Sequence, residues 1–228
     1  MVTHWRYNFN PVAPDPHSLD IEDIAHCLAR ESRFAGAYDW EWYSCPASTI
    51  LSPGSSNCRP SYSVAEHLVF VSRLAFQLAR QAGHSLSDCR RIALAGLLHD
   101  GMEAYFKDLP APLKHLAELS EYRELEERAL EVLFRKFNCA VSRKEYCIIE
   151  EADIELRHIE AAQIFLPALA WARPRVNLKL QGWFPSVAKK LFINRFFALS
   201  EVPSEAEPGG LRQFVPLPDC DGVSLPGA

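Results

Sequence analysis

The chain has 228 residues, enough for a sizeable hydrophobic core, and we expect a single domain spanning residues 1–228. Hydrophobic residues make up 48% and charged residues 23%, proportions typical of a water-soluble globular protein. The formal net charge of −5 argues against nucleic acid as the main partner, because duplex-binding proteins usually present a basic face.

Cysteine usage and hydrophobic runs predict where the protein resides. The seven cysteines are scattered and contain no Cys-x-x-Cys pair, which favours a reducing compartment. The first residues contain no apolar signal region, and no run approaches the ~18 apolar residues of a membrane span. We therefore expect a cytoplasmic protein that does not contact membranes.

The first third of the chain alternates between irregular and helical patterns. Residues 1–19 are rich in proline and predict an irregular arm. Asp20 is a good helix N-cap, and the apolar spacing after it predicts a helix that ends near Phe34. Residues 35–61 are rich in proline, glycine, serine and aromatic residues, which predicts a long loop.

The remainder of the chain reads as helices. Ser63 precedes Glu66 by three residues, a capping-box pattern that predicts a helix ending at Gly83. Ser87 begins a second helix, which is so apolar that we expect it to be buried. No run alternates as a strand would, so the predicted fold is an all-α bundle with long loops. Further helices are predicted over residues 116–137, from 142 to before 167, and over 185–199.

Two adjacent residues that commonly bind metals, His99 and Asp100, end the most apolar predicted helix. An imidazole and a carboxylate can share one divalent cation if other helices supply ligands, and His67 and Asp153 are candidates. Taken alone, His67 reads as a structural histidine and Asp153 as part of a solvated acidic face. As a set on buried helices they favour a cation, which would offset the two carboxylates.

The order of these residues, with the segments around them, resembles the HD-domain phosphohydrolase superfamily. The similarity is greatest to the bacterial HD-type 5′-deoxynucleotidases and to related phage dATP triphosphohydrolases. It covers a core from about residue 15 to about 165, while residues from about 170 to 228 form a C-terminal helical extension and a tail. The matching segments are residues 20–26, 32–34, 62–67, 97–100, 103–105, 108–114 and 151–153.

The resemblance implies an HD-domain helical bundle and one divalent metal ion, which can be Co, Mn, Mg or Zn. It implies that Glu103 is the catalytic carboxylate and that Asp108 is a second active-site acid. Glu103 follows His99 by four residues, so one helical turn would point both toward one cavity. The implied metal ligands are His67, His99, Asp100 and Asp153.

The resemblance also implies residues that bind substrate. Arg33 matches a phosphate-contacting arginine, and Phe34 matches an aromatic residue that lies against the sugar. Lys107 stands where the family has glycine, and it reads either as a phosphate contact or as a solvent-exposed side chain. Gly101 stands where alanine is common.

Residues 39–57 look like an insertion relative to compact family members. Trp40 and Trp42 in this loop are expected either to cover the nucleoside of the substrate or to pack the loop onto the bundle.

The leading functional hypothesis is a metal-dependent phosphohydrolase, most simply a 5′-nucleotidase that releases phosphate from deoxynucleoside monophosphates. The nearest alternative is a dNTP triphosphohydrolase, which would need extra cations for the outer phosphates. An alternative of another class is a non-catalytic nucleotide-binding module. The expected partner is a small nucleotide, and a homo-oligomer is left open. The candidate extra cations are Lys107, Lys114, Arg59 and Arg73.

Overall fold

The computed structural model describes residues 9–37, 61–107, 109, 114, 116–165 and 174–200. The predicted all-α fold is confirmed, because the described part contains helices and one isolated antiparallel bridge, between Ser32 and Ser63. The α-helices are α2 (Ile21–Leu28), α3 (Val64–Gln81), α4 (Leu86–Leu98), α5 (Glu103–Phe106), α7 (Ser120–Lys136), α8 (Arg143–Ile164) and α9 (Pro185–Ser200). The 3₁₀ turns are η1 (Pro16–Ser18), η2 (Arg33–Gly36) and η5 (Ala117–Leu119).

Helix α2 begins as predicted, because the side chain of Asp20 accepts the backbone N–H groups of the first turn. It ends at Leu28, so the prediction of a helix reaching Phe34 is wrong. The chain leaves the helix to pair with the segment before α3. The backbone N–H of Arg33 donates to the carbonyl oxygen of Tyr62 at 3.0 Å, a contact between distant residues that local periodicity does not encode.

Helices α3 and α4 pack against each other at the centre of the bundle. The two helices are in contact at Gly96, where a Cβ would meet the Cβ of Ala75 at 3.4 Å, an ordinary van der Waals distance. Helix α3 is capped by Ser63 as predicted. Helix α4 starts at Leu86, and its N-cap is Ser85, whose hydroxyl accepts the N–H of Asp88 at 3.1 Å. The predicted cap at Ser87 is therefore two residues late.

Helices α7 and α8 follow the predicted pattern with one difference. Residues 117–119 form the 3₁₀ turn η5, so α7 begins at Ser120 rather than at Leu116. Helix α8 begins with a full capping box, in which Ser142 and Glu145 each accept the other's backbone N–H.

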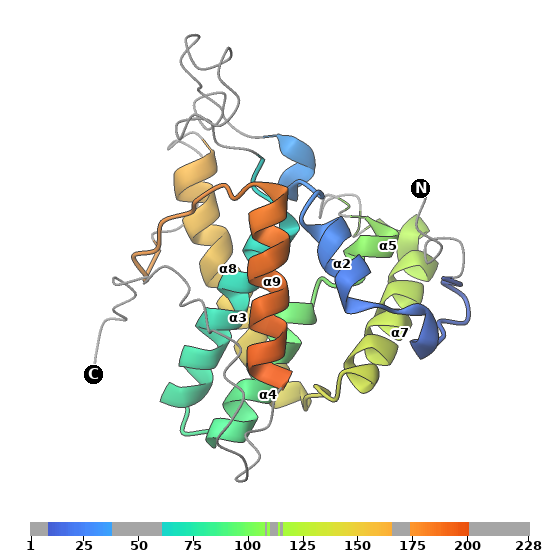
Figure 1. Cartoon of the computed structure of the whole chain (residues 1–228), viewed down its shortest axis with the longest axis horizontal. Coiled ribbons are helices and arrows are strands. Elements are labelled where there is room, and N and C mark those ends of the chain that lie inside the picture. Colours follow the sequence, from blue (N-terminus) through green and yellow to red (C-terminus); the bar gives the residue numbers. More distant parts are fainter. Residues whose placement is uncertain are drawn as a thin grey trace, which may run out of the picture.

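Residues 174–184 run as an irregular segment to α9, which packs on α2, α3 and α4 (Figure 1). Three side chains of the bundle hold this segment through its backbone. Glu155 accepts the N–H groups of residues 175 and 176, Gln163 pairs with the backbone of residues 178 and 180, and Glu66 accepts the N–H groups of residues 181, 182 and 183. The C-terminal extension is thus attached to the same helices that carry the candidate site.

The apolar side chains of these helices form one continuous core in the described part of the chain. Within that part, no helix combines the length and the apolar character that crossing a bilayer requires. The domain boundaries drawn from the sequence stay a prediction.

Candidate metal centre

His67 lies in the first turns of α3 and is fully buried. Its Nδ1 lies 2.6 Å from Oε1 of Glu160, which is fully buried on α8. A carboxylate on one ring nitrogen leaves the other nitrogen to act as a ligand. That nitrogen, Nε2, lies 3.3 Å from Oδ1 of Asp153 and 3.8 Å from Oδ2 of Asp100.

His99, the C-cap residue of α4, is held in a similar way by the backbone. Its Nδ1 lies 2.9 Å from the carbonyl oxygen of Gly96, which can only accept a proton, so Nδ1 carries the hydrogen. The other ring nitrogen of His99, Nε2, faces the cluster and lies 3.4 Å from Oδ2 of Asp100. The two Nε2 atoms of His67 and His99 are buried and have no hydrogen-bond partner among the described residues.

Ligand atoms of His67, His99 and Asp100 all lie within 4.8 Å of one another. Asp153 is not in this mutual set, but its Oδ1 approaches His67, while its Oδ2 forms an ion pair with Arg157 at 3.0 Å. Buried nitrogen atoms without partners are rare, and here they face carboxylates. Two imidazoles and two carboxylates are a donor set that divalent transition metals accept, so these residues fit the implied ion.

The charges of the site are mutually dependent. Burial raises the pKa of Asp100, but His99, Arg33 and His67 outweigh it and hold that pKa below its ordinary value. Burial likewise raises the pKa of Asp153, whereas contact with His67 and the nearby His99 and Arg157 bring it well below the usual range. Both carboxylates are therefore ionised at neutral pH and available to a cation.

Arg33 lies beside this cluster although it comes from a different part of the chain. It is buried, with Nη1 3.4 Å from Oδ2 of Asp100 and Nη2 3.9 Å from Oε2 of Glu160. Burial lowers its pKa, but the surrounding carboxylates raise it overall, so the guanidinium stays charged. The three residues that follow it, Phe34, Ala35 and Gly36, all have positive φ values, of 55°, 52° and 76°. This left-handed turn is costly for the two that are not glycine.

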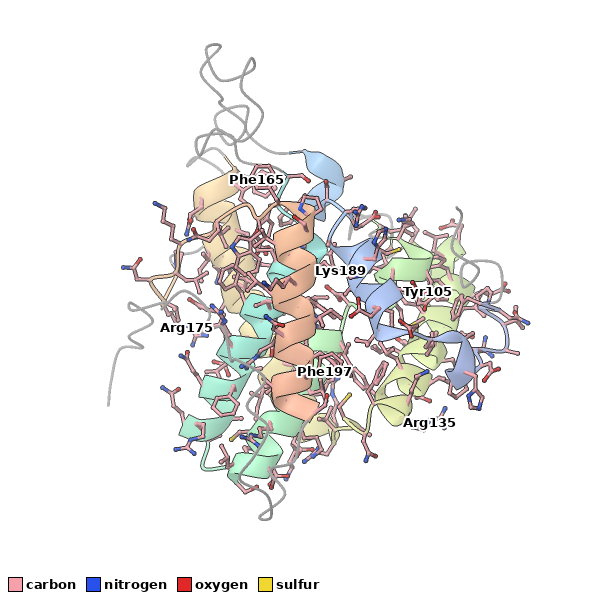
Figure 2. The ribbon with its side chains drawn as sticks, in the orientation of Figure 1. Tyr105, Arg135, Phe165, Arg175, Lys189 and Phe197 are labelled. Atoms are coloured by element: carbon pink, nitrogen blue, oxygen red, sulfur yellow. The ribbon has the colours of Figure 1, made fainter. Side chains whose placement is uncertain are left out.

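Phe34 makes an aromatic contact at the same end of the bundle. Its ring packs edge-to-face on Phe165, with 5.0 Å between centroids, next to the end of α8 (Figure 2). The guanidinium carbon of Arg33 lies 5.3 Å from the centre of the Phe34 ring. An apolar ring and a cation are thus adjacent, as a sugar–phosphate ligand would require.

Glu103 begins the short helix α5 and is buried. Its charge is one of those that raise the pKa of Arg33. Gly101, two residues earlier, has no room for alanine. A Cβ there would lie 2.8 Å from Cδ2 of Leu133 and 2.9 Å from the carbonyl oxygen of Leu98. Packing of α7 accounts for this departure from the usual family residue.

Two of the candidate cations for outer phosphates pair with acids. Lys107 forms an ion pair with Glu31, and its side chain is 47% exposed. Lys114 lies 2.7 Å from Glu126. Arg73 lies on α3, with its guanidinium 5.7 Å from the ring centre of Phe70. Asp108, Trp40, Trp42 and Arg59, and the insertion at 39–57, lie outside the described residues.

Glu160, Phe165 and the anchoring role of Glu66 were not predicted from the sequence. Glu160 follows Asp153 by seven residues, two helical turns, so helical periodicity places both on one face of α8. That spacing was a usable signal. Glu66 accepts backbone N–H groups from residues 181, 182 and 183, and burial raises its pKa to about 7 even though these N–H groups lower it.

Comparison with known proteins agrees with this arrangement. Residues 52–165 match the family described as 5′-deoxynucleotidase YfbR-like. The chain is 38% identical over 188 residues to the uncharacterized protein YfdR of Escherichia coli (strain K12). The aligned residues cover 80% of this chain and 85% of that protein. It is 29% identical over 153 residues to an uncharacterized protein of Rhodobacter capsulatus, RCAP_rcc00048. These aligned residues cover 66% of this chain and 65% of that protein. The chain therefore belongs to the YfbR-like family of HD-domain 5′-deoxynucleotidases.

Proposed function

We propose that the protein is a metal-dependent phosphohydrolase of deoxynucleotides, most simply a 5′-nucleotidase that releases phosphate from deoxynucleoside monophosphates. One observation carries the proposal. Two buried imidazole nitrogens without hydrogen-bond partners in the described structure face the carboxylate of Asp100, and the buried guanidinium of Arg33 lies 3.4 Å from the same carboxylate. The candidate metal ligands therefore lie beside a cation that suits a phosphate group, which supports the proposal.

His67, His99, Asp100 and Asp153 would hold the ion. Bound there, a divalent cation lowers the pKa of water and offsets charge on a phosphoryl oxygen. The two histidines are oriented for this role before any ligand binds, because Glu160 and the carbonyl of Gly96 each fix one ring nitrogen.

Arg33 would bind the phosphate group of the substrate. A guanidinium presents a planar fork of N–H donors that matches two phosphate oxygens, and burial strengthens that interaction. The Nε of Arg33 has no hydrogen-bond partner in the described part of the chain, so it can donate to a ligand. Phe34 and Phe165 would then lie against the sugar.

Glu103 would orient the attacking water and accept its proton on a carboxylate oxygen. Positioned acids and bases contribute this step in hydrolases, and Glu103 is a buried carboxylate at the start of α5. Asp108 is proposed as the second active-site acid on the basis of the family resemblance.

The charges around the site favour a monophosphate. Lys107 and Lys114, which would meet outer phosphates, are already paired with Glu31 and Glu126. A triphosphate would have to break these ion pairs or find other cations, whereas a monophosphate needs Arg33 and the metal ion.

A product screen tests the proposal. The metal-depleted protein is supplied with Co²⁺, Mn²⁺, Mg²⁺ or Zn²⁺, and phosphate and triphosphate are measured for each dNMP and dNTP. We expect metal-dependent phosphate release from dNMPs, which Glu103→Ala lowers roughly 10²–10⁴-fold. Triphosphate release from dNTPs in preference would establish the alternative activity. If the protein releases neither phosphate nor triphosphate and binds no metal, it is a non-catalytic nucleotide-binding module.

A further inference from the structure

Glu160 is a buried carboxylate that the proposed reaction does not use directly. It lies on α8 with no exposed surface, and its two oxygens face two different parts of the candidate site. Oε1 lies 2.6 Å from Nδ1 of His67, and Oε2 lies 3.9 Å from Nη2 of Arg33. A buried charge is costly unless it is paired, so this carboxylate needs both partners.

We propose that Glu160 is a positioning residue that sets both the metal-binding nitrogen of His67 and the location of the Arg33 guanidinium. This inference rests on the proposed function. With Nδ1 committed to Glu160, His67 presents Nε2 to the cluster, where the carboxylates of Asp100 and Asp153 lie at 3.8 Å and 3.3 Å. The negative charge of Glu160 also makes the imidazole of His67 a stronger ligand for a metal ion.

The contact with Arg33 differs from the contact with His67. Oε2 of Glu160 lies 3.9 Å from Nη2 of Arg33, beyond hydrogen-bond distance, so this carboxylate attracts Arg33 by charge rather than by a directional bond. The guanidinium therefore remains near the cluster while its Nε, which has no hydrogen-bond partner among the described residues, stays available to a phosphate. Tyr62, in the segment before α3, also approaches this carboxylate, because burial, the charges of Glu160 and Glu66 and a contact with Glu160 raise the pKa of its hydroxyl.

Two isosteric variants separate positioning from general stability. Glu160→Gln keeps the shape and removes the charge. Glu155→Gln is its matched control, because Glu155 is a second buried carboxylate of α8 whose described partners are Arg175 and the N–H of Val176. Both variants remove one buried charge from the same helix, and circular dichroism checks that each is folded.

The first measurement is the affinity for Mn²⁺ alone, by calorimetry. We expect Glu160→Gln to weaken Mn²⁺ binding roughly 10–100-fold, the usual effect of removing a partner of a metal-binding histidine, and Glu155→Gln to leave it within about twofold. A second titration with inorganic phosphate on the Mn²⁺-loaded protein should show weaker phosphate binding in Glu160→Gln. One of the charges that hold Arg33, that of Glu160, is absent in that variant.

The second measurement needs no variant of Glu160. In the Zn²⁺-loaded wild type, ¹⁵N-resolved imidazole spectra should show the hydrogen of His67 on Nδ1, with His67→Ala providing the assignment. A hydrogen on Nε2 would overturn the inference, as would unchanged Mn²⁺ affinity in Glu160→Gln while the wild type binds Mn²⁺ normally. A wild type that binds no divalent ion at all would instead overturn the proposed function.

Discussion

Arg33 and Asp100 are separated by 67 positions in the chain, yet Nη1 of the arginine lies 3.4 Å from Oδ2 of the aspartate. The same oxygen lies 3.4 Å from Nε2 of His99 and 3.8 Å from Nε2 of His67. A cation held by the histidines would compete with Arg33 for this carboxylate. Metal binding is therefore expected to weaken the ion pair and direct the guanidinium to a phosphate.

Removal of a ligand should remove the metal. His99→Ala and Asp100→Ala are expected to abolish stoichiometric binding of a divalent ion and all hydrolysis, because each takes one donor from a small set. Elemental analysis of the purified variants measures the metal content. His84→Ala, a histidine just beyond the end of α3, is the control and should retain wild-type metal. Full metal content in His99→Ala would exclude His99 as a ligand.

Arg33→Lys should impair binding of the phosphate group while the metal remains. Lysine keeps the charge but loses the planar fork, and a lost charged hydrogen bond of about 1.5–3 kcal/mol corresponds to roughly 10–100-fold in kcat/KM. Steady-state kinetics on a dNMP measure the effect. Arg30→Lys is the control, since Arg30 is exposed and contacts His26 on its own helix. Equal kinetics in both variants would remove Arg33 from substrate binding.

Glu103→Ala is expected to keep the metal and to lower kcat by roughly 10²–10⁴, the usual contribution of a positioned acid or base. Turnover and metal content are measured on the same preparation. Near-normal turnover of the metal-bound Glu103→Ala variant would contradict this prediction and show that Glu103 takes no part in proton transfer.

Lys107 has φ 79° and ψ 151°, a conformation that only glycine adopts readily. Lys107→Gly should therefore raise the free energy of unfolding by about 1–3 kcal/mol relative to Lys107→Ala, which removes the same side chain but keeps the strain. Urea denaturation of the two variants measures the difference. If the two variants are equally stable, residue 107 is not strained.

The same two variants also test whether Lys107 contacts phosphate, because both lack the lysine side chain. If Lys107 contacts outer phosphates, both variants should lose more activity on dNTPs than on dNMPs relative to the wild type.

The ion pair between Glu145 and Arg91 predicts a pH dependence of stability. Hydrogen bonds from Arg91 hold the pKa of Glu145 at about 2, against an unfolded value of about 4.5. The stabilisation is therefore complete above about pH 5 and is lost as the pH falls from 4.5 toward 2. Because the Arg91 side chain is 30% exposed, we expect only roughly 1–2 kcal/mol.

Glu145→Gln provides the comparison. The difference in unfolding free energy between wild type and variant, from denaturant titrations at pH 7, 5 and 4, should be largest at pH 7 and should begin to narrow at pH 4. A difference that does not change with pH would assign the stabilisation to the helix cap rather than to the charge of Glu145.

Much of the helical structure could be predicted from the sequence. The caps at Asp20, Ser63 and Ser142 form as expected, because a capping side chain bonds to backbone N–H groups two or three residues away. The position of α9 was also predictable, from proline at its start and its apolar content. The prediction from local sequence was wrong at Ser87, because the neighbouring Ser85 caps the start of α4. It was also wrong at Phe34, because a tertiary backbone contact of Arg33 with Tyr62 follows the end of α2.

The residue types of the candidate site could also be chosen from the sequence, since imidazoles and carboxylates on buried helices imply a partner for their charge. Their mutual arrangement could not. The contact of Glu160 with His67 spans 93 positions, and that of Arg33 with Asp100 spans 67. Such pairs form only when α3, α4 and α8 pack together, because side-chain periodicity gives the face of a helix but not the residue that the face meets. The sequence therefore determined the helices and the candidate ligands, whereas packing alone decided that one buried carboxylate would serve both a histidine and an arginine.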